Sequence, residues 1–203
     1  MYKKILAASL VAFTTLSSFM PAKNKIRLVI DASQGGNGKG TVSKDDQWES
    51  ALCLQFAQSL EKVAKSHGID VVLTRVSNSE YKMMGDRAMT ATPIEGGKTY
   101  FVSFHVNNSE KDKNLRGAEV RYDANNHFAE ESATLAKNIK KNMTPFADPK
   151  VDSKETLMVL HNNTVPAVAV IPGYMSNNEE MKRMKDPAFQ TKLANAIVKS
   201  IEE

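Results

Sequence analysis

The sequence predicts a single-domain α/β fold with a mostly parallel central sheet of about six strands and helices on both faces. Three observations support this prediction. Short apolar runs alternate along the chain with longer amphipathic segments, which is the order of strand and helix that favours a parallel sheet. A length of 203 residues, 41% of them hydrophobic, suits one core. No repeat or low-complexity linker divides the chain.

The N-terminus, residues 1–22, has the layout of a secretory signal peptide. Lys3 and Lys4 precede an apolar run over residues 5–13, and small and hydroxyl residues follow it. The run is too short for a transmembrane helix, which needs about 18 or more apolar residues. We therefore expect residues 23–203 to form the folded domain of a secreted or periplasmic protein, with no stable membrane insertion after cleavage.

Six short apolar segments, bounded by polar, Gly or Pro residues, predict the strands: Arg27–Asp31, Asp70–Thr74, Thr99–His105, Ala118–Tyr122, Thr156–Leu160 and Ala167–Ile171. Apolar residues at helical spacing predict three main helices: Glu49–Lys65, Phe128–Lys141 and a C-terminal helix with Phe189, Leu193, Ile197 and Ile201 on one side. Two further patterns are typical of helix starts, Asn177 followed by Glu180 and Asp186 followed by Pro187.

Composition and charge exclude several kinds of partner and binding site. Lys and Arg number 27 and Asp and Glu 23, and without Lys3 and Lys4 the formal charge falls from +4 to +2. So small an excess does not favour a nucleic-acid partner. The single Cys53 excludes an internal disulfide and a Cys-rich zinc site, and its place on the apolar side of a helix predicts a buried thiol. The glycine-rich residues 35–40 lack the spacing of a P-loop.

Three predicted strands end beside residues of interest for function. The first strand ends near Gln34, the third ends at His105, and the last ends at Ile171. Open α/β sheets bind ligands beyond the carboxyl ends of their strands. We therefore expect these three positions to converge on one site.

Seven segments carry a family resemblance, in this order: Val29-Ile30-Asp31-Ala32 with Gly35-Gly36, Val72-Leu73-Thr74-Arg75, Val102-Ser103-Phe104-His105, Arg116-Gly117-Ala118-Glu119-Val120, Met158-Val159-Leu160, Pro166-Ala167-Val168-Ala169-Val170 and Gly173-Tyr174-Met175-Ser176-Asn177. They resemble the zinc-dependent N-acetylmuramoyl-L-alanine amidases, which cleave the amide between the lactyl group of the glycan and the first alanine of the peptidoglycan stem. The resemblance implies zinc as cofactor and peptidoglycan or muropeptides as partner.

The same resemblance implies the roles of particular residues. Glu49 and His105 stand at two of the family's three zinc-ligand positions, and Gln34 stands where the family has a His. Ile171 occupies the position of the catalytic Glu. A Gln amide is a much weaker zinc ligand than imidazole, and Ile cannot carry a proton. The expectation is a weak or absent metal site and little amidase turnover.

Other residues have open roles. Asn107 and Arg116 are candidate substrate-binding residues, although an Arg before Gly also fits a surface ion pair. Asp31 is expected to orient the loop that follows it. Glu119 and Glu155 are candidates for a substitute base, without support from their spacing.

The two remaining ligand positions each have a structural alternative. Glu49 lies three residues after Asp46, which also fits a helix-start capping pattern. His105 at a strand end also fits a simple hydrogen bond to a loop backbone.

Three hypotheses on function remain open. The first is an exported amidase-fold protein that has lost catalysis and binds peptidoglycan. The second is an active zinc amidase with a rearranged metal site. The third is an envelope module that binds another protein or a small ligand.

Overall fold

One six-stranded sheet organises the fold, and its strands lie in the order β2-β1-β3-β6-β4-β5. The computed structural model describes residues 25–154 and 157–203. The strands are β1 (Lys25–Ala32), β2 (Asp70–Leu73), β3 (Gly97–Phe104), β4 (Glu119–Arg121), β5 (Lys150–Asp152) and β6 (Ala167–Ile171). Neighbours among β2, β1, β3 and β6 are parallel, whereas β4 runs antiparallel to β6 and parallel to β5. The predicted α/β fold with a mostly parallel sheet is confirmed.

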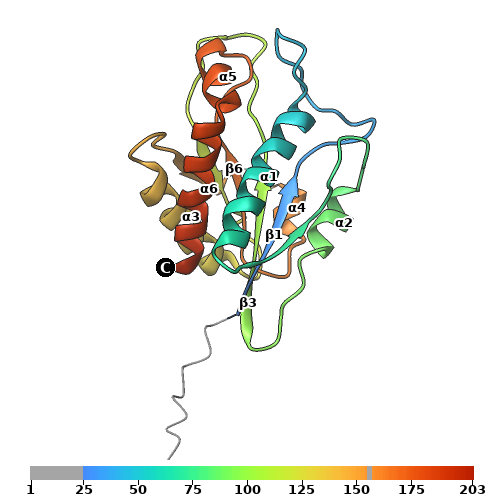
Figure 1. The fold of residues 1–203 in the computed structure, drawn as a ribbon, viewed down its shortest axis with the longest axis vertical. Helices are drawn as coiled ribbons and strands as arrows, with labels where there is room; N and C mark the ends of the chain where they lie inside the picture. The colour runs from blue at the N-terminus through green and yellow to red at the C-terminus, as the bar shows by residue number, and fades with distance from the viewer. Residues whose placement is uncertain (1–24, 155–156) are drawn as a thin grey trace, which may run out of the picture.

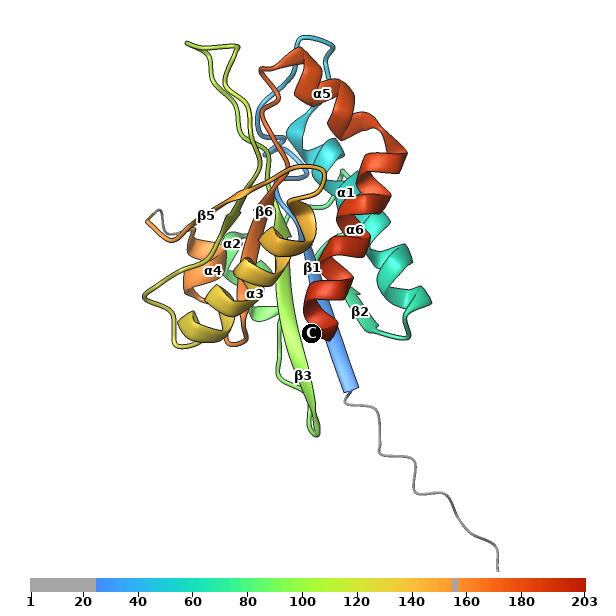
Figure 2. The same cartoon turned by 90° about the vertical axis from the view of Figure 1, so that its left-hand side faces the viewer.

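Helices cover both faces of the sheet, as predicted. They are α1 (Glu49–Ser66), α2 (Met84–Met89), α3 (Ala129–Met143), α4 (Met158–His161), α5 (Asn178–Lys185) and α6 (Pro187–Glu202). Figure 2 shows the sheet between α1 and α6 on one side and α2 and α4 on the other. Contacts of α3 with α6 and β6 place it on the side of α1 and α6. In Figure 1 the loops that leave β1 and β3 rise to the same end of the sheet, where α5 also lies.

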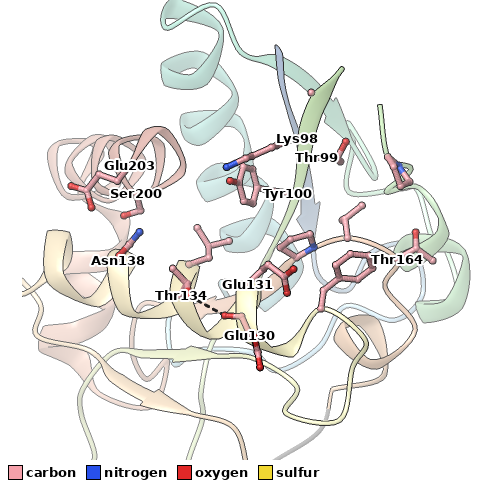
Figure 3. A pocket seen from close by; sticks show the side chains of 16 residues that line it. Lys98, Thr99, Tyr100, Glu130, Glu131, Thr134, Asn138, Thr164, Ser200 and Glu203 are labelled. Carbon is pink, nitrogen blue, oxygen red and sulfur yellow. Dashed lines mark hydrogen bonds between the residues drawn. The ribbon is translucent and has the colours of Figure 1, made fainter. Parts of the chain in front are cut away.

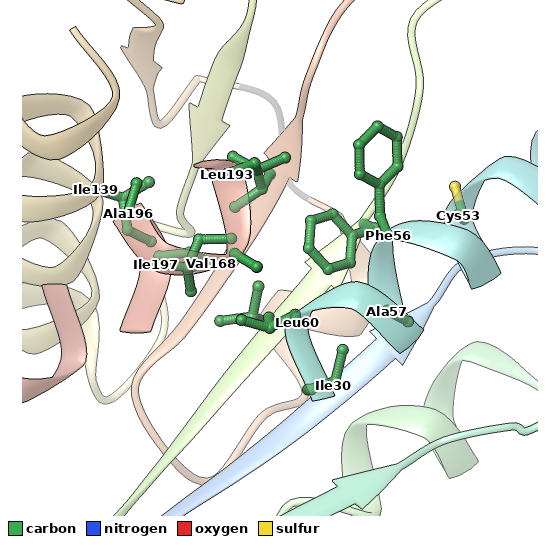
Figure 4. Packing of buried hydrophobic residues seen from close by; sticks show 14 of the residues in the cluster. Ile30, Cys53, Phe56, Ala57, Leu60, Ile139, Val168, Leu193, Ala196 and Ile197 are labelled. Carbon is green, nitrogen blue, oxygen red and sulfur yellow. The ribbon is translucent and has the colours of Figure 1, made fainter. Parts of the chain in front are cut away.

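The middle of each central strand is apolar because both faces of the sheet are covered there. Leu28, Val29 and Ile30 of β1 are all fully buried. The larger cluster lies under α1, α3 and α6, where the rings of Phe56 and Phe104 stack with centroids 5.5 Å apart (Figure 4). Cys53 is buried in the same cluster, as predicted.

Both predicted helix-start signals are confirmed at the C-terminus. The Asn177 side chain accepts from the N–H groups of Glu179 and Glu180 at the start of α5. Asp186 caps α6 by accepting from Ala188 N, and Pro187 is the first helical residue.

The prediction of a strand at Thr156–Leu160 is wrong. Residues Met158–His161 form the short helix α4, and the remaining strand of the sheet is β5, Lys150–Asp152. A short apolar run does not distinguish a strand from a buried helical turn, and Val159 and Leu160 bury their side chains from α4.

Two predictions fall outside the described residues. The signal segment at residues 1–22 is one, and the candidate base Glu155 is the other. Within residues 25–154 and 157–203, none of the helices combines the length and apolarity needed to cross a membrane.

Candidate functional site

Asp31 anchors a buried polar framework beneath the carboxyl ends of β1 and β3. Its carboxylate accepts from Thr74 Oγ1 at 2.7 Å, from Ser103 Oγ at 2.6 Å, and from Arg87 Nε and Nη2 at 2.8 and 2.6 Å. Burial raises the pKa of Asp31, but the hydrogen bonds and charge of Arg87 outweigh that effect and hold the pKa below its ordinary value. Asp31 thus has a structural role, as predicted, but its carboxylate binds Thr74, Ser103 and Arg87 rather than the loop that follows it.

Arg75 is the second buried member of this framework, and only 3% of it is exposed. Its guanidinium donates to five acceptors: Ala32 O (2.9 Å), Ser33 O (3.0 Å), Ser50 O (2.6 Å), Ser77 O (3.0 Å) and Asn78 Oδ1 (3.1 Å). These acceptors lie on the loop after β1, on the first turn of α1 and on the loop after β2. Arg75 therefore holds three segments in register around the residue at position 34.

Gln34 itself lies on the loop that Arg75 holds. Its φ of 63° is left-handed, which costs a non-glycine residue roughly 1–2 kcal/mol. The Gln34 side chain lies beside the Glu49 carboxylate, and its amide favours the charged form of that carboxyl. Gly40 makes room for this pair, because a Cβ there would lie 2.8 Å from Gln34 Cγ and would also collide with Glu49 Oε2.

Glu49 is the first residue of α1, and its carboxylate is surrounded by neutral donors. Thr41 N donates to Glu49 Oε2 at 3.1 Å, and the backbone N–H of Val106 also donates to the carboxylate. Burial nevertheless raises the pKa of Glu49 above its ordinary value. The capping pattern with Asp46 is wrong, since Trp48 is the N-cap residue of α1 and makes no side-chain cap.

His105 follows β3 directly and lies next to Val106, the residue that binds Glu49. Its backbone N–H donates to Val170 O at 3.2 Å. The ring atom Nε2 is buried and has no hydrogen-bond partner among the described residues. The alternative role, a hydrogen bond from the His105 side chain to a loop backbone, is not observed for this atom. Burial lowers the pKa of His105 to about 4, and the ring is neutral near pH 7.

Ile171 ends β6 and is 2% exposed. Glu119 of β4 lies directly opposite it in the antiparallel register. The Glu119 carboxylate accepts from Arg121 Nε at 2.8 Å and from Asn107 Nδ2 at 3.0 Å. The carboxylate of Glu119, opposite Ile171 in the sheet, thus already accepts hydrogen bonds from two side chains.

The two candidate substrate-binding residues differ in their surroundings. The Asn107 backbone joins the loop after β3 to the loop after β6, with N donating to Gly173 O at 3.0 Å and O accepting from Met175 N at 2.7 Å. Arg116 is exposed and, in the described part of the chain, makes no ion pair. The substrate-binding role of both residues stays a prediction.

The donor set does not fit a zinc ion held by three strong protein ligands. No group of three or more His, Cys, Asp or Glu side chains placed to hold a metal exists in residues 25–154 and 157–203. Glu49 and His105 supply at most two such ligands, and the third position carries the weakly basic amide of Gln34, which lies beside Glu49.

A cavity of about 610 Å³ lies elsewhere, at the amino ends of β3 and β6 (Figure 3). Tyr100 of β3, Leu135 of α3 and Pro166 before β6 line it, together with Glu130 and Glu131 at the start of α3. It is therefore separate from the residues that the sequence singles out, which lie at the carboxyl ends of the strands.

Comparison with known protein families matches residues 28–203 to the family described as N-acetylmuramoyl-L-alanine amidase. The chain belongs to this amidase family. Among solved structures of the family, the amidase from Clostridium difficile 630 is 28% identical, with a TM-score of 0.76 over 88% of this chain and 96% of that one. The catalytic domain of CwlV from Bacillus (Paenibacillus) polymyxa is 27% identical, with a TM-score of 0.74 over 87% and 96%.

Curated relatives of this amidase-family chain include two proteins named as amidases. The probable cell wall amidase LytH of Staphylococcus epidermidis is 27% identical over 187 residues, which cover 90% of this chain and 59% of LytH. The N-acetylmuramoyl-L-alanine amidase AmiA of Escherichia coli is 25% identical over 219 residues, covering 86% of this chain and 74% of AmiA. The chain thus spans less than two thirds of the length of LytH.

Sequence reasoning missed two parts of the site. Arg75 ends the segment Val72-Leu73-Thr74-Arg75, and a cation just after a short apolar strand is a signal that it can bind the neighbouring loops. Gly40 lies in the glycine-rich residues 35–40, whose spacing excludes a P-loop but does not indicate a role in packing. Its function is to leave room for the side chains of Gln34 and Glu49.

Proposed function

We propose that this chain is an exported peptidoglycan-binding protein of the amidase family that does not hydrolyse peptidoglycan by the family mechanism. Membership of the family and the cell-wall names of its relatives support the ligand class. The N-terminal segment with Lys3, Lys4 and an apolar run supports export.

The observation that carries the proposal is the contact between Gln34 and Glu49. In place of an imidazole ligand, position 34 carries an amide that lies beside the neighbouring Glu49 carboxylate. At the position of the catalytic Glu, Ile171 is buried and has no proton to exchange. A general acid–base group alone contributes about 10²–10⁴ in rate, and it acts as a unit with the bound metal. Because both positions are replaced, we expect no amide hydrolysis by this mechanism, rather than a slower version of it.

Incubation of the purified full chain with isolated sacculi and zinc tests both halves of the proposal. The protein is expected to sediment with the sacculi and to release no stem peptides, while an active amidase of the family serves as the positive control. Chelator-sensitive release of stem peptides would contradict the loss of catalysis. Failure to sediment would contradict peptidoglycan binding.

One observation favours a second candidate, an active zinc amidase with a rearranged metal site. The buried Nε2 of His105 has no hydrogen-bond partner among the described residues, and such a nitrogen is available to bind a metal ion. This candidate requires near-stoichiometric zinc in protein purified without chelator, and loss of activity in His105→Ala. The proposed binding protein requires neither.

A further inference from the structure

Two exposed aromatic side chains flank the glycine-rich turn that follows Gln34. Trp48 is 39% exposed and Tyr81 is 61% exposed. Single exposed apolar residues are ordinary on protein surfaces and need no function. These two differ because both are held against the same turn, although one precedes α1 and the other follows β2.

The turn is shaped to accept Tyr81. A Cβ at Gly36 would lie 2.8 Å from Tyr81 Cβ, and a Cβ at Gly38 would lie 3.3 Å from Tyr81 Cε2. The loop that carries Tyr81 is tied down as well, since Gly36 N donates to Asn78 O at 2.8 Å and Arg75 binds the same loop. One edge of Tyr81 therefore lies on the turn, and most of the side chain faces solvent.

Trp48 is held from the other end of the turn. Lys39 Nζ lies 5.3 Å from the centroid of the Trp48 ring, a cation–π contact. The backbone of Trp48 pairs with Val42 in an isolated bridge, and Glu49 N donates to Thr41 O at 2.8 Å. Because Gly38 contacts Tyr81 and Lys39 contacts Trp48, adjacent residues of the turn connect the two rings.

Polar groups lie on the turn that the two rings contact. Asn37 and Lys39 are both exposed on the turn and offer an amide and an ammonium group to a ligand. Aromatic rings beside hydrogen-bonding groups suit a ligand that has an apolar face and a polar rim. A pyranose ring has this character, because its axial C–H groups form the faces while its hydroxyl and N-acetyl groups project from the edge.

We propose that Trp48 and Tyr81, here called the aromatic platform, bind a sugar ring of the peptidoglycan glycan strand. The inference rests on the proposed function, and it adds the part of peptidoglycan that is bound and the residues that bind it. The platform lies next to Gln34 and Glu49, because the turn that carries it begins after Gln34 and ends at Gly40, which packs on both side chains. A glycan seated there reaches the residues at the family's reactive positions. Both rings are held before the ligand arrives, so little side-chain entropy is lost on binding.

Trp48 is the only tryptophan of the chain, and its fluorescence therefore reports on this site alone. The probe is a soluble tetramer of N-acetylglucosamine added to the full chain, with a free L-Ala-D-Glu stem peptide as comparison. The tetramer is expected to change the Trp48 emission in a saturable way, and the peptide is expected to leave it unchanged. A saturable response to the peptide alone would overturn the assignment to a sugar.

Variants separate ring contact from general damage. Calorimetry is expected to show that Tyr81→Ala weakens tetramer binding roughly two- to tenfold, while Tyr81→Phe binds like the parent protein. Met83→Ala is the matched control, since Met83 is 66% exposed two residues further along the chain. Equal affinities for Tyr81→Ala and Met83→Ala would overturn the platform.

Sedimentation with sacculi distinguishes this inference from the function on which it rests. If the chain sediments with sacculi and the tetramer leaves Trp48 emission unchanged, the platform is wrong and the proposed function stands. If the tetramer binds at Trp48 and the chain does not sediment, the sugar site stands and binding to intact peptidoglycan is wrong.

Discussion

The buried framework around Asp31 and the neighbouring reactive positions differ in how their polar groups are satisfied. In the framework, the Asp31 carboxylate accepts hydrogen bonds from Thr74, Ser103 and Arg87. The Arg75 guanidinium donates to backbone carbonyl oxygens of the neighbouring segments. At the reactive positions, His105 Nε2 has no partner in the described chain, and Ile171 offers no polar atom. The comparison indicates that the framework around Asp31 and Arg75, rather than the residues at positions 105 and 171, holds the chain path at this end of the sheet.

The framework is expected to give the largest effect on stability. Asp31→Ala removes one partner of a buried ion pair and leaves Arg87 uncompensated, which costs about 3–5 kcal/mol of unfolding free energy. Asp70→Ala is the matched control, because the Arg27–Asp70 pair is 31% and 55% exposed and such a pair contributes roughly 0–1 kcal/mol. Urea unfolding of both variants measures the difference. Equal losses would show that the framework is no more than a surface-like pairing.

The next effect is the pH dependence that His105 introduces at the reactive positions. Its pKa is lowered to about 4 in the folded chain, so below its ordinary pKa of 6.5 the unfolded chain binds a proton that the folded chain does not. Stability is therefore lost as the pH falls from 6.5 towards 4, by about 1.4 kcal/mol per pH unit at most. Asp31 adds nothing in this window, because its lowered pKa places its loss of stability below the ordinary range of an Asp.

Unfolding free energies at pH 7 and pH 5 for the parent, His105→Gln and His127→Gln measure this effect. The raised pKa of Glu49 acts in the opposite direction, and the comparison of variants removes its contribution. His105→Gln is expected to lose less stability on acidification than the parent, while the exposed His127→Gln behaves like the parent. Identical slopes in all three proteins would contradict the burial of a neutral His105.

A smaller effect is expected where the loop packs on Gln34 and Glu49. Gly40 and Gly68 share a φ of +75°, but a Cβ at Gly68 meets nothing within 4 Å. Gly68→Ala therefore measures the backbone cost alone, roughly 1–2 kcal/mol. Gly40→Ala is expected to cost about 1–3 kcal/mol more, because it overpacks the side-chain pair. Equal melting-temperature shifts for the two variants would mean that Gln34 and Glu49 are not packed together.

Much of the fold was predictable because its signals are local and repeated. The apolar run Leu28–Ile30 of β1 predicts a buried strand, and the residues at Asn177 and Asp186 predict helix starts, each from its own neighbours in the sequence. The segment at Met158–His161 was not predictable, because four residues fit one helical turn as well as a strand. The three-residue strand β5, Lys150–Asp152, has a single apolar residue and leaves almost no pattern.

The site was predictable in its membership and not in its contacts. Residue spacing and the family resemblance placed Gln34, Glu49 and His105 at the ends of strands and the start of a helix. The sequence does not show that Gln34 adopts a left-handed φ or that its side chain lies beside Glu49. Both depend on packing at Gly40 and on the hydrogen bonds of Arg75, and the residues next to Gln34 do not reveal these contacts.

Zinc binding is the most direct test of the claim that the framework persists without the metal centre. Native mass spectrometry of the full chain with one equivalent of zinc compares the parent with Gln34→His, which restores the third strong ligand beside Glu49 and His105. The account predicts a metal-free parent and a zinc-bound Gln34→His variant whose urea unfolding in the absence of zinc matches that of the parent. One zinc per chain in the parent, removed by chelator and lost in His105→Ala, would contradict it.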